Sequence, residues 1–140
     1  MRETRSPALR GLGIAFAALI LVAGCDIETL RIQICPDGLD VLVSTEPQAE
    51  FSWSGGCGVG ELVVREAGTS GRIIWQIQDR DASNRLLAPI RFGAVPSEAT
   101  ELIAPAQFEP GRLYVVEVKS LQRIQGRVVV SGLGSGSFRR

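Results

Sequence analysis

The sequence predicts an all-β fold, a two-sheet sandwich of about seven to eight strands. Apolar and polar residues alternate with a period of two in several short segments, which is the pattern of strands with one buried face. The 140 residues include 16 Gly and 7 Pro, and turn-forming residues separate these segments. Once an amino-terminal signal peptide is set aside, the remaining length fits one small domain.

Composition excludes several classes of function. The chain has 15 Lys and Arg, 15 Asp and Glu, and no His. A neutral chain has no excess of cations to neutralise phosphates, so we expect no nucleic-acid partner. The absence of imidazole removes the commonest general base and metal ligand, and no carboxylate pair is spaced for acid–base chemistry. We therefore expect no catalytic residues, no metal site, no cofactor and no enzymatic activity.

The first 24 residues have the layout of a secretory signal. Arg2, Arg5 and Arg10 form a basic start, and residues 12–24 then carry no charge. This apolar run is shorter than the roughly 20 residues that a membrane span needs, but it suits the apolar region of a signal peptide. The run leads into Leu21-Val22-Ala23-Gly24-Cys25.

This ending resembles the lipobox of bacterial lipoproteins. The resemblance implies cleavage between Gly24 and Cys25, a diacylglycerol thioether on Cys25, and anchoring to the extracytoplasmic (periplasmic) face of a membrane. Asp26 is similar to the signal that retains lipoproteins in the inner membrane of enteric bacteria, which favours that membrane over the outer one. An ordinary cleaved signal, or an uncleaved anchor with a free thiol at Cys25, is the alternative. Residues 25–36 would then be a short tether and first strand.

Cys35 and Cys57 form an even pair in an oxidising compartment. Strand-like residues 39–44 and 50–54 flank a proline-containing turn and predict a hairpin. Both cysteines fall at the open end of that hairpin, nearly opposite each other, so we predict a disulfide that stabilises the fold by roughly 3 kcal/mol. Two unrelated buried thiols are the other interpretation.

Further strands follow along the chain. Ile73, Trp75 and Ile77 alternate onto one face, which favours a core position for Trp75 over an exposed binding aromatic. The Gly/Ser-rich residues 132–140 predict a flexible tail. The remaining strands are expected at residues 62–66, 112–120 and 125–131, with an edge strand at 89–92.

The order of these landmarks resembles a fibronectin type III domain over residues 37–131. Trp53 near the end of the second strand is similar to that family's core Trp. The stretch Phe108-Glu-Pro-Gly-Arg-Leu-Tyr114-Val-Val-Glu-Val118 looks like the family's corner motif, in which the Tyr hydroxyl bonds an upstream backbone group. Other immunoglobulin-like sandwiches share this arrangement. The long connection at residues 79–100 departs from the family's pattern.

Two motifs suggest ligand chemistry only superficially. The glycine-rich residues 55–60 precede a strand and not a helix, which indicates a turn and not a phosphate-binding loop. Asp79, Asp81 and Asn84 resemble part of a calcium loop, but the glycine and the closing Glu are missing, so a surface loop is expected.

A short tether at Cys25 would hold the disulfide end near the bilayer and turn the opposite end outward. We expect a lipid-anchored module for protein–protein interaction or scaffolding, with an unidentified envelope protein as its partner. The outward segments are residues 46–48, 68–71, 106–112 and the tail. A small ligand- or glycan-binding lipoprotein that uses residues 79–100 is the alternative.

Overall fold

The computed structural model describes residues 34–140. The predicted signal peptide, the cleavage site at Gly24, the lipid site at Cys25 and the sorting residue Asp26 lie outside the described residues. Most of the expected tether lies outside them too.

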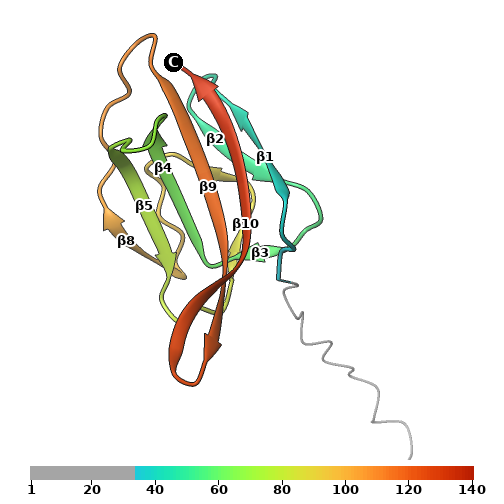
Figure 1. The fold of residues 1–140 in the computed structure, drawn as a ribbon. Helices are drawn as coiled ribbons and strands as arrows, with labels where there is room; N and C mark the ends of the chain where they lie inside the picture. The colour runs from blue at the N-terminus through green and yellow to red at the C-terminus, as the bar shows by residue number, and fades with distance from the viewer. Residues whose placement is uncertain (1–33) are drawn as a thin grey trace, which may run out of the picture. The chain divides into compact units, whose positions relative to one another are not determined.

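Within the described part of the chain the fold is all-β, without a helix, as the sequence predicts. The strands are β1 (Leu39–Ser44), β2 (Glu50–Trp53), β3 (Gly58–Val59), β4 (Glu61–Glu66), β5 (Ile73–Asp79), β6 (Leu86–Leu87), β7 (Ile90–Arg91), β8 (Ala99–Ile103), β9 (Leu113–Ile124) and β10 (Arg127–Arg139). The two longest strands, β9 and β10, form a hairpin through the middle of the molecule (Figure 1).

Eight strands form one mixed sheet in the order β7-β2-β1-β10-β9-β4-β5-β8, and β3 pairs with β6 in a second, small sheet. Within the large sheet β1 and β10 pair in parallel, and the other neighbouring strands are antiparallel. The large sheet curls, so that its concave face encloses the core (Figure 1). A sheet of this size curls because each strand is twisted relative to its neighbour.

Alternate residues of the central strands fill the core. Tyr114, Val116 and Val118 of β9 are all buried, in agreement with the predicted face of that strand. Trp75 of β5 is fully buried, which confirms its predicted core position. Ile73 was expected on the same face but is exposed, and Ile74 is buried in its place. The reason is a bulge: Val64 pairs with Trp75 and Arg65 pairs with Ile73, so Ile74 is an extra residue that shifts the alternation.

The prediction of a flexible tail at residues 132–140 is wrong. These residues are the second half of β10, whose pairing with β9 continues to Arg139 opposite Leu113. Phe138 is buried and lies 5.6 Å from Tyr114, ring centroid to ring centroid. The glycines that suggest a linker are instead the positions where β1 packs closely against β10, with no room for a side chain at Gly134.

The connection at residues 79–100 is more structured than the sequence indicates. It contains β6 and the beginning of β8, and the edge strand expected at residues 89–92 is confirmed as β7, which pairs with β2 at one end of the sheet order. Strand β8 was not predicted. Four of its five residues are exposed, so its sequence lacks the alternation that identifies a half-buried strand.

The predicted disulfide between Cys35 and Cys57 is present, with a Cα–Cα distance of 5.0 Å. Trp53 is buried beside it, and its indole Nε1 donates a hydrogen bond to the Cys57 carbonyl oxygen at 3.0 Å. At the other end of the sheet the Tyr114 hydroxyl accepts a hydrogen bond of 2.8 Å from the Glu109 backbone N–H. All three aromatic residues expected in the core are therefore buried.

Candidate binding groove

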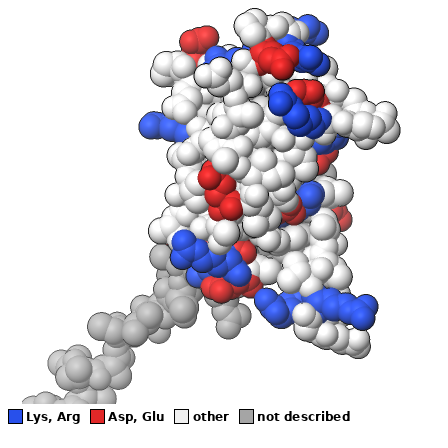
Figure 2. Space-filling view, turned by 90° about the vertical axis from the view of Figure 1, so that its left-hand side faces the viewer, with Lys and Arg blue, Asp and Glu red and all other residues white. Residues whose placement is uncertain are grey.

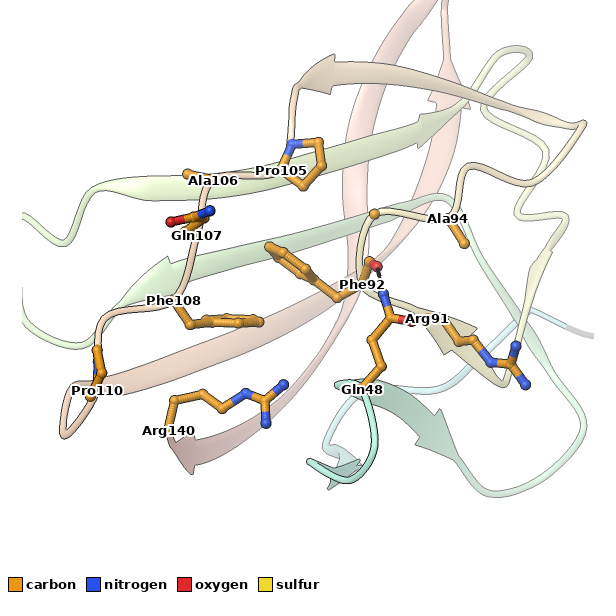
Figure 3. Close-up of a pocket in the computed structure, with 11 residues that line it drawn as sticks. Gln48, Arg91, Phe92, Ala94, Pro105, Ala106, Gln107, Phe108, Pro110 and Arg140 are labelled. Carbon is orange, nitrogen blue, oxygen red and sulfur yellow. Dashed lines mark hydrogen bonds between the residues drawn. The ribbon is translucent and has the colours of Figure 1, made fainter.

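A solvent-open groove of about 850 Å³ lies at the edge of the core (Figure 3). This volume is within the range of pockets that hold small ligands or peptide side chains. Eleven residues from four segments line it: Gln48, Arg91, Phe92, Gly93, Ala94, Pro105, Ala106, Gln107, Phe108, Pro110 and Arg140.

The segments that follow the two outer strands, β7 and β8, face each other across the groove (Figure 3). After β7, the Phe92 N–H donates to the Ala49 carbonyl at 2.9 Å, which fixes one wall. After β8, the Ala106 N–H donates to the Ile74 carbonyl at 2.8 Å, which fixes the other wall. Because both walls are hydrogen-bonded to strands of the large sheet or their flanking residues, the groove is preformed.

Two half-buried phenylalanines make the floor. The rings of Phe92 and Phe108 have centroids 4.3 Å apart. Each ring packs against a fully buried aromatic residue: Phe92 lies 5.3 Å from Trp75, and Phe108 lies 4.9 Å from Tyr114. The floor is thus the exposed side of the aromatic core, and a rigid aromatic surface can bind apolar groups with little loss of side-chain entropy.

Polar side chains at the rim are held in place by the protein itself. The Gln48 amide donates to the Phe92 carbonyl at 2.9 Å. The Arg140 guanidinium lies 5.4 Å from the centroid of the Phe108 ring and donates to the Thr45 carbonyl at 2.7 Å. Arg91 forms an ion pair with Glu50. No lining residue is acidic, so the groove combines an apolar floor with basic and amide groups at its rim.

Three of the four segments expected to face outward contribute to this groove. Residues 46–48, residues 106–112 and the end of β10 each supply lining side chains, whereas residues 68–71 supply none. Neither phenylalanine was identified as a site residue from the sequence. The sequence signal that could have identified them was their position: both lie within a few residues of a proline and outside the main alternating segments.

The interpretation of residues 79–84 as a surface loop is wrong for two of its members. Asp79 and Asn84 are both buried. The Asn84 side chain exchanges two hydrogen bonds with the backbone N–H and carbonyl of Leu121. Burial raises the pKa of Asp79, but hydrogen bonds from the Arg85 side chain and from two backbone N–H groups outweigh it, so the pKa is lowered overall. These residues anchor a turn.

In the glycine-rich residues 55–60, Gly55 and Gly56 bend the chain, and the next strand, β4, begins at Glu61, as the predicted turn before a strand requires. The two-residue strand β3 (Gly58–Val59) inside this segment was not predicted. Among residues 34–140, no cluster of three or more Cys, Asp or Glu side chains is placed to bind a metal ion. In the same residues no helix has the length and apolarity to cross a membrane.

Comparisons of the chain with protein-family models, with curated proteins and with solved structures gave no match. The functional interpretation therefore rests on the residues and their geometry.

Proposed function

We propose that the chain is a lipid-anchored extracytoplasmic module that binds a protein partner at the bacterial envelope through the aromatic groove. The anchor is the diacylglycerol thioether on Cys25, which the lipobox-like residues 21–25 imply. The module acts by recruitment or scaffolding and not by turnover.

An immunoglobulin-like, fibronectin type III-like sandwich is the finer fold assignment within this proposal. Two observations support it. Strands β7, β2 and β1 would form one layer and the other five strands of the large sheet the second, joined where β1 pairs in parallel with β10. The hydrogen bond from the Glu109 N–H to the Tyr114 hydroxyl matches the expected corner.

The observation that carries the proposal is the solvent-open aromatic floor. Phe92 and Phe108 leave part of their rings uncovered although both are continuous with the buried core. Pro105 and Pro110 extend this apolar surface along one wall (Figure 3). Grooves lined by aromatic residues and proline suit an extended peptide segment with apolar side chains, whose carbonyl groups accept hydrogen bonds from the rim.

The position of the groove agrees with such an anchor. The described chain begins next to Cys35, and β1 then runs away from the disulfide to the turn at residues 46–48, which contributes Gln48 to the groove. In Figure 1 the carboxyl terminus lies at the opposite end from the start of β1. A tether of ten residues from Cys25 to Cys35 spans at most about 34 Å, so the disulfide end would be the end nearest the anchor, and the groove would lie toward the far end.

Crosslinking in cells tests this function directly. A photoreactive amino acid replaces Gln107, an exposed residue on the groove wall, and in a matched control it replaces Asp40, an exposed residue of β1 outside the groove. We expect one defined protein adduct from position 107 and none from position 40. No adduct from either position, or the same adducts from both, would contradict a specific partner in the groove.

A second candidate function is the binding of a glycan or another small ligand. The observation that favours it is that Phe92, from the connection at residues 79–100, forms part of the floor, since exposed aromatic rings stack on sugars. This function predicts that peptidoglycan fragments raise the melting temperature of the purified protein, and that Gln107 gives no protein adduct.

A further inference from the structure

The hairpin of β9 and β10 continues beyond the rest of the large sheet (Figure 1). Residues 122–131 are all exposed, and in this stretch the two strands pair only with each other, as in Arg127 opposite Ile124 and Val129 opposite Gln122. We call residues 122–131 the projecting ribbon. A two-stranded ribbon with nothing packed on it is marginally stable in water, so we asked whether its side chains suit a binding partner.

The projecting ribbon is aliphatic and basic. Four of its ten residues are large aliphatic side chains with exposures between 38% and 51%: Ile124, Val128, Val129 and Val130. Its only charged residues are Arg123 and Arg127, and it has no Asp or Glu. Figure 2 shows basic and uncharged atoms on the part of the molecule that projects at the lower right.

Both faces of the ribbon carry this combination. Ile124 and Arg127 are cross-strand neighbours on one face, and Arg123 and Val128 are neighbours on the other. A protein partner would cover one face and leave the other in water. A lipid interface surrounds an inserted ribbon on both faces, and arginine can keep its charge at the headgroups while its stem lies among apolar groups.

The root of the ribbon lies where the described chain begins. The Ser120 hydroxyl donates to the Cys35 carbonyl at 2.8 Å, and Ser120 pairs with Gly132 where the ribbon joins the large sheet. From this root to the tip at Gln125 is five residues, or about 17 Å of strand. This step rests on the proposed anchor at Cys25, whose tether of at most about 34 Å keeps the root close to the bilayer.

We propose that the projecting ribbon inserts its tip into the headgroup region of an anionic bilayer and gives the module a second contact with its membrane. The two arginines bind lipid phosphates, and the aliphatic side chains enter the boundary with the acyl chains. With two contacts with the membrane instead of one, the module has a fixed orientation, and the groove points away from the surface.

Fluorescence quenching by lipids tests the insertion. The protein carrying Val129→Trp, purified as cells process it, is combined with vesicles of phosphatidylethanolamine and phosphatidylglycerol with or without brominated acyl chains. Leu42→Trp, at a position that is 66% exposed on β1, is the matched control. The parent protein gives the emission of the buried Trp53 and Trp75, which is subtracted. We expect about twofold quenching of the remaining emission for Val129→Trp, because the interface lies within reach of the bromines, and none for Leu42→Trp.

The arginines have a separate readout. Arg123→Gln together with Arg127→Gln should lower the equilibrium constant for insertion of the ribbon about 25-fold, since each arginine near an anionic surface contributes about a fivefold factor. The double variant should also remove the dependence of the quenching on phosphatidylglycerol. The absence of quenching at 129, equal quenching at 42 and 129, or a ribbon that crosslinks to a second copy or to another protein and is shielded from lipid would overturn the proposal. Because quenching is read on the protein with whatever anchor it has, a missing lipid on Cys25 would refute the proposed anchor without deciding the ribbon's role.

Discussion

The close approach of β1 to β10 depends on a glycine, and Gly134→Ala tests it. A Cβ atom at position 134 would lie 2.5 Å from the Leu39 carbonyl oxygen and 2.9 Å from the Val118 Cγ2 atom. Because Cβ atoms do not come within 3.0 Å of such atoms, β1 must move away from β10, which disturbs the parallel pairing of Leu39 with Gly134. Such overpacking costs about 1–3 kcal/mol.

The net effect is smaller than the steric cost, because alanine also restricts the unfolded chain by about 0.4–1 kcal/mol relative to glycine. We expect the free energy of unfolding to fall by about 1–2 kcal/mol, and the urea midpoint to fall by roughly 1 M given an ordinary denaturant slope. Emission from the buried Trp53 and Trp75 reports the transition. Ser135→Ala, at the exposed neighbouring position, is the control and should change little. A midpoint for Gly134→Ala that stays equal or rises would refute the packing of residues 132–140 as a strand.

Three further predictions concern the core and its turns. Tyr114→Phe removes the acceptor for the Glu109 N–H and should lower the free energy of unfolding by about 1 kcal/mol in the same urea assay; an unchanged midpoint would contradict the corner. Cys57→Ala opens a 22-residue loop and should cost about 3 kcal/mol, whereas a variant as stable as the parent would show that the disulfide does not form. The lowered pKa of Asp79 means that its ion pair with Arg85 stabilises the fold above the carboxyl group's usual pKa, and that this contribution is lost as pH falls through the lowered value. Asp79→Asn should therefore flatten the acid limb of a melting-temperature profile against pH, and an acid limb identical to the parent's would contradict this role.

The parts of the fold that were predictable are those where local pattern and burial agree. Strand β9 alternates from Leu113 to Ser120, so its buried face there could be assigned from the sequence alone. The disulfide followed from hairpin geometry, because the two cysteines lie at its open end. Ile73 shows the limit of the method: a bulge opposite β4 shifts the alternation by one residue, and no local signal in the sequence marks it.

The prediction of a flexible tail at residues 132–140 was wrong for a different reason. Glycine and serine are typical of linkers, yet here the glycines are required by the lack of space between β1 and β10, which only the tertiary pairing reveals. The groove could not be predicted from the sequence either. Gln48, Phe92, Phe108 and Arg140 are far apart in the sequence and meet only because the large sheet curls and brings the segments after its outer strands together.

Mass spectrometry of the mature amino terminus tests the central claim most directly. We predict that the protein isolated from membranes begins at Cys25 and carries the mass of a diacylglycerol thioether on that residue, and that Cys25→Ser abolishes both the modification and membrane retention. A mature protein that begins at another residue, or one that stays membrane-bound with an unmodified Cys25 thiol, would contradict the claim.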